Sequence, residues 1–446
     1  MAGDTNNKIA AAPKALLSVT DGSFLMIGMV IGVGIFKVPS GVAASVSSVP
    51  AFLLAWLLGG AASLCGALVY AELSARYPQT GGEYGFLARG FGPAAGFLFG
   101  WSRMTVIQTG AIAAVAFVFG DYASQILHLG TRSAAIYAVL AVIVFTGLNV
   151  AGTRRSKNLQ KTMEIALIAA MVLMSLGALL KSGAPVRVEP APQSGTFGLA
   201  MILVLFTYGG WNEAAYLGGE LRDAKRSMTR VLVVGIVAVS ALYLLVNLGY
   251  LAVLGLEGMR NSSVVAADVM HVIAGDRGAL LLSAVVCVSA ATTLNAAIFT
   301  GARTMYALGQ DFKFLRVLGD WRESGSTPAN ALILQGAITL ALVLAGSVTP
   351  DGFSSMVAYT APVFWTFFLA AGLTLFVFRA RGGEDPAFRV PLYPVVPGAF
   401  CAMCLYMLYS SIDYAVHGSN FSTAVLAGII VMASGIPLYL WARSRQ

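Results

Sequence analysis

The chain has 446 residues, of which 58% are hydrophobic and only 11% charged, and its mean hydropathy is +0.79. A soluble domain cannot bury that much apolar surface, so the composition excludes a soluble enzyme or binding module and indicates a polytopic membrane protein. The formal net charge of +8 comes from basic residues scattered through predicted loops. That distribution indicates orientation in a membrane and not nucleic-acid binding.

Apolar stretches of about 20 residues, separated by short loops, predict an all-α chain that forms a single membrane domain over residues 1–446. Twelve transmembrane helices are expected. Their ranges are 20–45, 49–73, 92–121, 133–151, 161–180, 197–219, 229–255, 278–305, 329–347, 352–378, 392–413 and 421–442.

The distribution of basic residues predicts the orientation of these spans. Most of the 28 basic residues fall in segments that are intracellular if both termini lie inside. Because cytoplasmic loops carry an excess of Lys and Arg, we expect both termini to be cytoplasmic, with residues 1–19 as an N-terminal segment. No cleavable signal peptide is apparent, so the first span would direct insertion into the cell membrane.

The first span is interrupted at its midpoint by Gly28, Gly32 and Gly34. Each glycine costs about 1 kcal/mol relative to alanine in a helix interior. In hydrocarbon that weakness is tolerated only where the freed backbone groups face protein, water or a ligand, so we expect a broken helix. The N-terminus of the outer half would attract an anion and the C-terminus of the inner half a cation. An α-amino acid carries both charges on adjacent groups.

The sixth span repeats this arrangement with Gly209 and Gly210. Either glycine cluster alone could be a small-residue packing face. Broken segments at matching places in two halves predict instead a transporter built from inverted repeats, with the binding site between them. The predicted repeats cover 20–181 and 197–378, and two further helices occupy 392–442.

Ionisable residues inside the predicted spans are candidates for function. Arg103 in the third span has two interpretations: a functional group, or a helix lock that pairs with Glu72 or Glu164. Glu164 and Glu213 are the acidic residues well inside the spans, and a membrane carboxyl can carry a proton. Because we expect Arg103 beside Glu164, Glu213 is the preferred proton carrier.

The eighth span carries hydroxyl side chains on one face, including Thr292 and Thr293. They could supply oxygen ligands for sodium beside the carbonyls of the first break, or they could bond to their own helix. Four cysteines also fall in predicted spans, and Cys401 and Cys404 lie three residues apart without a nearby histidine or carboxylate cluster. We expect these cysteines to be apolar filler and predict no metal and no cofactor.

Four blocks of the sequence together resemble a known family. They are Ile31–Phe36 (IGVGIF), Tyr77–Tyr84 (YPQTGGEY), Phe206–Asn212 (FTYGGWN) and Val390–Pro397 (VPLYPVVP). The family is the amino acid–polyamine–organocation (APC) superfamily, and the third block is most similar to the L-type amino acid transporters and their bacterial relatives. This resemblance implies a leucine-transporter-like five-plus-five inverted repeat with broken helices 1 and 6, followed by two C-terminal helices.

The resemblance also implies substrate-binding positions at both breaks. They are Val30, Gly32, Val33, Gly34, Ile35, Phe206, Thr207 and Gly209. Amides of the first glycine motif (Val33, Gly34 and Ile35) would bind the substrate carboxylate, and carbonyls at both breaks would bind its ammonium group. The ring of Phe206 would cover the substrate as a gate.

Three departures from the family pattern affect these expectations. Val33 replaces a common serine, which suggests a more apolar pocket. Residues 166–168 are apolar where many sodium-independent relatives carry a lysine. The segment 122–134 lacks the cysteine by which eukaryotic light chains bind a heavy chain, so we expect no disulfide-linked partner.

The predicted function is secondary active transport of amino acids by alternating access. We expect neutral L-amino acids and sodium-independent exchange or proton symport, with sodium coupling through Thr292 and Thr293 as the less favoured option. Alternatives are a polyamine or organic-amine carrier, for which Glu213 is the candidate acidic group, and an amino-acid sensor that does not transport. No catalytic constellation and no phosphate-binding loop is present in the sequence, so we do not expect an enzyme or an ATP-driven pump.

Overall fold

The computed structural model describes residues 18–77, 82–152, 157–181, 195–214, 221, 224–322, 327–382, 386–417 and 422–444. Over these residues the chain is helical, and an isolated antiparallel bridge pairs Arg322 with Thr327. The predicted N-terminal segment 1–19 lies almost wholly outside the described residues. Part of the second family block, 78–81, and residues 182–194, which lie between the fifth and sixth predicted spans, are also outside the described residues.

The helices follow the predicted spans closely. They are α1 Val19–Val30, α2 Gly34–Ala44, α3 Val49–Arg76, α4 Glu83–Phe91, α5 Pro93–Ser102, the π-helical turn η1 Arg103–Ile107, α6 Gln108–Ile126, α7 Ser133–Ala151, α8 Lys157–Leu180, α9 Phe197–Thr207, α10 Trp211–Ala214, α11 Ala224–Arg260, α12 Val265–Asp311, the 3-10 helix η3 Lys313–Gly319, α13 Ala329–Gly346, α14 Gly352–Arg381, α15 Val395–His417, α16 Ser422–Ala433 and α17 Gly435–Arg443.

Within the described ranges, nine helices are long and apolar enough to cross a membrane, and the bent pair α1–α2 makes a tenth. Two further predicted spans correspond to shorter apolar helices, Glu164–Leu180 and Phe197–Thr207. The predicted class, an all-helical polytopic membrane protein, is therefore confirmed. The number twelve stays a prediction.

The predicted break in the first span is present. Ser18 starts α1 with a reciprocal capping box, because its hydroxyl accepts the Asp21 N–H (3.2 Å) while the Asp21 carboxylate accepts the Ser18 N–H (3.1 Å). α1 ends at Val30, α2 begins at Gly34, and the two axes differ by 58°. The Ile31 N–H completes the last helical hydrogen bond of α1, to the Ile27 carbonyl (2.8 Å), and residues 32 and 33 belong to neither helix.

The predicted break in the sixth span is also present, between α9 and α10. Gly210 there has φ 103°, a region that strains any residue with a Cβ. A Cβ at this position would also collide with the carbonyl oxygen of Met29 on α1. Gly210 is thus required twice, by its own backbone angle and by the close approach of the two broken helices.

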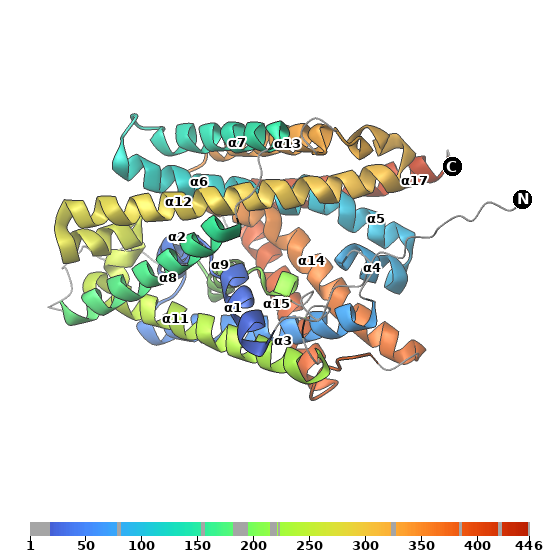
Figure 1. The fold of residues 1–446 in the computed structure, drawn as a ribbon, viewed down its shortest axis with the longest axis horizontal. Helices are drawn as coiled ribbons and strands as arrows, with labels where there is room; N and C mark the ends of the chain where they lie inside the picture. Colours follow the sequence, from blue (N-terminus) through green and yellow to red (C-terminus); the bar gives the residue numbers. More distant parts are fainter. Residues whose placement is uncertain are drawn as a thin grey trace, which may run out of the picture.

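The broken helices lie at the centre of the molecule and long helices surround them (Figure 1). α12 runs along the length of the body, with α6, α7 and α13 on one side and the broken helices, α11 and α3 on the other. Helices at corresponding places in the two predicted repeats contact each other: α2 packs on α9, α3 on α11, α6 on α12, and α7 on α13.

One predicted boundary is wrong. The segment 256–277 was expected to be an outer loop, but α11 continues to Arg260 and α12 begins at Val265. Gly255 (φ 65°) and Gly275 (φ 66°) bend these helices sharply, so their outer arms are separate short helices. Apolar length alone does not detect such arms, because they are too short to span a membrane.

Candidate functional site

A cavity of about 500 Å³ lies between the two breaks. Ten of the predicted binding, gating and coupling residues line it: Val30, Gly32, Val33, Gly34, Phe206, Thr207, Gly209, Glu213, Thr292 and Thr293. Ile35 is not among the lining residues; its side chain is fully buried, and its carbonyl accepts the Tyr250 hydroxyl at 3.4 Å. Residues 184 positions apart in sequence, such as Gly28 and Asn212, face the same space.

The outer part of the first break presents the start of α2 to the cavity. The first amides of a helix have no acceptor within that helix, so the N-terminus at Gly34 offers N–H groups and a partial positive charge. A Cβ at Gly32 would meet nothing within 4 Å, whereas a Cβ at Gly34 would lie 3.1 Å from the Thr207 side chain. Gly32 therefore borders open space, and Gly34 is the point where the two breaks touch.

A tyrosine that sequence reasoning missed joins the breaks. The Tyr243 hydroxyl on α11 lies 3.1 Å from the Val30 carbonyl oxygen and 3.2 Å from that of Thr207. One hydroxyl hydrogen can serve only one carbonyl at a time, so acceptor capacity remains at these two carbonyls. Such carbonyls can accept hydrogen bonds from an ammonium group.

Phe206 lines the cavity, and its ring packs on Phe353 at the start of α14. The two ring centroids lie 5.7 Å apart with perpendicular planes, a favourable edge-to-face geometry. Phe353 also lines the cavity. Sequence reasoning missed Phe353 because its partner lies 147 residues earlier in the chain.

Charged and polar groups form the end of the cavity beside α4, which is the inner end in the predicted orientation. Glu83 at the start of α4 accepts hydrogen bonds from Arg103 (3.4 Å) and from the Asn212 side chain (3.1 Å). Glu213 lies within electrostatic reach of Arg103 and Glu83. Arg103 sits on the π-helical turn η1, a kind of irregularity that is frequent at functional sites.

The predicted partners of Arg103 are wrong. Glu72 pairs instead with Arg76 (2.8 Å) and Arg379 near the far end of α3, and the salt bridge of Arg103 is with Glu83. The argument that preferred Glu213 over Glu164 as a proton carrier therefore loses its basis, because the electrostatic influence of Arg103 falls on Glu213. Arg103 pairs with Glu83 and not with the predicted residues because the short helix α4 brings Glu83 into the site.

A side-chain hydrogen bond also links α4 to the C-terminal end of α12. The Tyr84 hydroxyl is hydrogen-bonded to the Asp311 side chain. Burial, reinforced by the negative charge of Asp311, raises the pKa of Tyr84 to about 12. The hydroxyl therefore stays protonated at physiological pH and remains a donor, which holds α4 over the inner end of the site.

The polar wall of the cavity comes from α6 and α12. The Gln108 side chain donates to the Ala297 carbonyl (3.0 Å), and the Thr292 hydroxyl donates to the Ser289 carbonyl of its own helix (2.8 Å). Of the two interpretations of the α12 hydroxyls, own-helix bonding thus describes Thr292. Asn295 faces away from the cavity and accepts a hydrogen bond from Asn149 (2.7 Å).

Glu164 on α8 reaches the cavity from the opposite side. Its carboxylate lies directly against Gly28 of α1, where a Cβ would come within 2.7 Å of an oxygen. Gly28 therefore leaves room for an acidic side chain. Neither glycine spacing nor composition predicts this contact.

The described residues contain no group of three or more His, Cys, Asp or Glu side chains that could hold a metal ion. Cys65, Cys287, Cys401 and Cys404 are free thiols, and all but Cys65 are buried. The absence of a metal and of a cofactor stays a prediction.

The fold and the site together define a class: a polytopic membrane protein whose central cavity is bordered by the main chain of two broken helices. The sequence pattern of the amino acid permease family matches residues 17–434, and the chain belongs to that family. This membership confirms the resemblance to the APC superfamily carried by the four blocks. It also confirms a permease and not an enzyme.

Curated relatives cover most of the chain. The serine/threonine exchanger SteT of Bacillus subtilis is 28% identical over 431 residues, which is 95% of each chain. The b(0,+)-type amino acid transporter 1 of Rattus norvegicus is 29% identical over 398 residues, 85% of this chain and 80% of the relative. The human cystine/glutamate transporter is 24% identical over 445 residues, 96% of this chain and 85% of the relative.

Proposed function

We propose that the protein is a secondary transporter of neutral L-amino acids that works by alternating access. One observation carries the proposal: both breaks face one cavity, and Tyr243 joins them. The amides at the start of α2 would bind the substrate carboxylate, and the carbonyls of Val30 and Thr207 would bind its ammonium group. The amides of Val33 and Ile35 and the carbonyls of Phe206 and Gly209 complete the proposed binding set.

We further propose twelve spans arranged as a five-plus-five inverted repeat with two C-terminal helices. The contacts between corresponding helices, such as α3 with α11 and α6 with α12, support this arrangement. The concentration of basic residues in the segments assigned to the cytoplasm supports cytoplasmic termini in a cell membrane. We also propose that no disulfide-linked heavy chain is needed, because 122–134 contains no cysteine.

Neutral substrates suit the cavity walls. Gln108, Thr293 and Thr360 bring polar groups, while Val33 and Phe364 are apolar. The relatives are named for serine and threonine, for cystine and glutamate, and for large neutral amino acids, so the family accepts side chains of several kinds. We favour sodium-independent exchange or proton symport, in keeping with the resemblance to the L-type branch.

Purified protein in liposomes tests the proposal. Uptake of radiolabelled amino acids is measured for all twenty compounds, with and without sodium, a pH gradient, or unlabelled amino acid inside. We expect saturable uptake of neutral L-amino acids that persists without sodium. The amide and the decarboxylated form of the best substrate should compete poorly, because each lacks the carboxylate that α2 would bind. Full competition by both would contradict main-chain recognition.

A second candidate, an organic-amine carrier, is favoured by one observation. The cavity is lined by three glutamates, Glu83, Glu164 and Glu213, against one arginine, Arg103. Excess negative charge suits a cation without a carboxylate. The same liposome assay separates the candidates, since an amine carrier would transport putrescine or ethanolamine in preference to neutral amino acids.

Replacing Glu213 with glutamine tests proton coupling. If its carboxyl carries the proton, we expect Glu213→Gln to lower pH-driven uptake at least about tenfold, while exchange against internal amino acid continues. Glu164→Gln is the matched variant, because Glu164 is the other acidic residue that sequence reasoning considered. Loss of pH-driven uptake in Glu164→Gln alone would transfer the role to Glu164.

Labelling of single cysteines tests the orientation. Asn261 and Lys313 are exposed residues at the two ends of the helical body. In intact cells, a membrane-impermeant maleimide should label Asn261→Cys and should leave Lys313→Cys unlabelled until the membrane is permeabilised. The reverse pattern would contradict cytoplasmic termini.

A further inference from the structure

A second cavity, of about 530 Å³, borders the cavity between the breaks at Phe353. The two cavities share the lining residues Ile202, Phe353, Val357 and Ala361, so only a thin layer of side chains separates them. In the proposed orientation this second cavity opens toward the outside. We call it the outer cavity.

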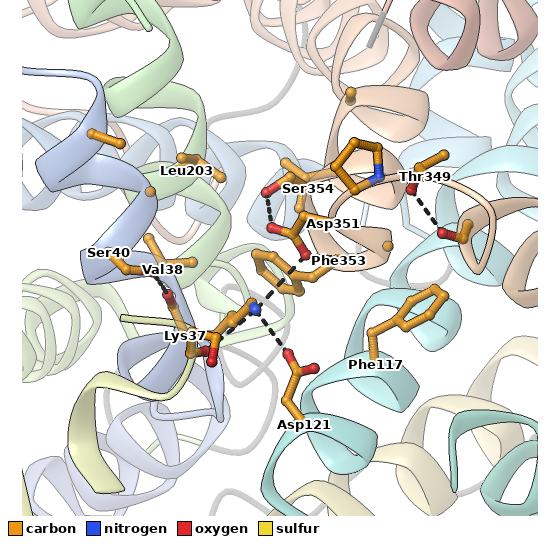
Figure 2. Close-up of a pocket in the computed structure, with 18 of the residues that line it drawn as sticks. Lys37, Val38, Ser40, Phe117, Asp121, Leu203, Thr349, Asp351, Phe353 and Ser354 are labelled. Atoms are coloured by element: carbon orange, nitrogen blue, oxygen red, sulfur yellow. Dashed lines mark hydrogen bonds and ion pairs between the residues drawn. The ribbon is translucent and has the colours of Figure 1, made fainter. Parts of the chain in front are cut away.

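A buried lysine stands at the centre of the outer cavity (Figure 2). The Lys37 side chain on α2 is only 9% exposed, and its ammonium nitrogen lies 2.8 Å from a carboxylate oxygen of Asp121 and 3.7 Å from one of Asp351. It also donates to the Ser263 carbonyl at 3.4 Å. Burying an ammonium is costly unless opposite charges surround it, which these two aspartates do.

The three charges belong to three separate parts of the fold. Lys37 lies one turn into α2, the outer half of the broken helix; Asp121 lies on α6; and Asp351 caps α14. The Asp351 carboxylate accepts the Phe353 N–H (3.1 Å) and the Ser354 hydroxyl (2.6 Å), which fixes it above the Phe206–Phe353 pair. A movement of α2 away from α6 and α14 would remove the lysine and leave two carboxylates that need a cation.

From this geometry we propose that the outer cavity is a transient binding site for zwitterionic amino acids. Asp121 and Asp351 receive the substrate ammonium group, and Lys37 receives its carboxylate. When no substrate is bound, the Lys37 ammonium group lies where the substrate ammonium group would bind, and it neutralises Asp121 and Asp351. An arriving zwitterion inserts between lysine and aspartates, so every buried charge keeps an opposite partner while α2 separates from α6 and α14.

This inference rests on the proposed function, since it assigns a role in amino acid uptake. It also separates the outer cavity from the cavity between the breaks by chemistry. The outer site uses charged side chains, whereas the inner site uses main-chain groups. Loss of an outer charge should therefore change recognition from one face of the membrane only.

Right-side-out and inside-out membrane vesicles test this asymmetry with radiolabelled L-serine, and with L-leucine as a second probe. We expect Asp351→Asn to raise the apparent KM from the outer face about tenfold, the effect of losing one charge-assisted contact. The apparent KM from the inner face should stay unchanged. Lys37→Met should act in the same direction, because it removes the carboxylate partner.

The set of variants includes controls for a loss of folding. Asp351→Asn keeps the 2.8 Å ion pair between Lys37 and Asp121, so it leaves the buried ammonium compensated. Asp276→Asn is the matched control, because that carboxylate is 87% exposed and pairs with His271 away from the cavity. If Lys37→Met yields no folded protein, the apparent KM values of Asp351→Asn and Asp121→Asn from the two faces test the proposal.

Equal changes of KM on both faces, or no change on either face, would overturn the outer site and leave the three charges as a static helix contact. The wild type separates the two proposals. If it transports neither probe nor any other amino acid from either face, the proposed function itself fails. If it transports and the variants act symmetrically, only the outer site fails.

Discussion

Gly34→Ala should lower amino acid uptake about tenfold and Gly34→Leu more than about a hundredfold, because overpacking costs about 1–3 kcal/mol and each 1.4 kcal/mol is a factor of ten. A Cβ at Gly34 would lie 3.1 Å from the Thr207 side chain and 3.3 Å from its Cα. It would therefore push α2 away from α9 and displace the helix start that is proposed to bind the carboxylate. Uptake into liposomes, normalised to folded protein, measures the effect.

Two glycines provide controls for this prediction. Gly147 on α7 lies outside the cavity and has open space where a Cβ would be, so Gly147→Ala should leave uptake unchanged. Gly32→Ala places a methyl group in the open space that borders the cavity, so it should raise the KM for substrate without disturbing the contact between α2 and α9. Full uptake by Gly34→Leu would show that the junction of the two breaks has no role in transport.

Phe206→Ala should lower uptake about tenfold or more, whereas Phe206→Tyr and Phe206→Trp should keep most of it. Phe353 lines both the cavity between the breaks and the outer cavity, and the Phe206 ring packs on it with the ring centroids 5.7 Å apart. Alanine would join the two cavities and admit water to the charged groups of the substrate, which weakens their electrostatic interactions. Initial rates of uptake for the three variants measure the effect.

Removal of another phenylalanine ring, outside both cavities, is the control for this second prediction. Phe91 on α4 is 47% exposed and does not line either cavity, so Phe91→Ala should transport normally. Equal and full activity of Phe206→Ala, Phe206→Tyr and Phe206→Trp would reduce Phe206 to a helix-packing residue.

Local sequence signals located the two breaks but not the residues that connect them. Gly32, Gly34 and Gly210 are visible in sequence because a weak helix former in a membrane span needs an explanation. Tyr243 gives no such signal, because a tyrosine in an apolar span is ordinary and its hydroxyl meets the breaks only in three dimensions. The broken architecture was therefore predictable, and the hydrogen bonds that fix it were not.

The inner end of the cavity shows the same limit for charges. Arg103 was predicted to lie inside a span, but its predicted partners, Glu72 and Glu164, are wrong. The actual partner, Glu83, follows a glycine turn and enters the site on a short helix. Depth along a span is readable from hydropathy, whereas the direction of a short connecting helix depends on its packing.

The close contact between the broken helices has a consequence for how substrate preference could change. Every α-amino acid has the same ammonium and carboxylate groups, and only the side chain differs. In the proposed binding mode the breaks offer main-chain atoms to these invariant groups, and the breaks touch through Gly34 and Gly210, which leave no space for a larger residue. Diversification of substrates is therefore confined to the walls supplied by α6, α12 and α14. A new specificity should arise there, by exchanging residues such as Gln108 or Thr360, while the shared half of the ligand continues to bind unchanged backbone.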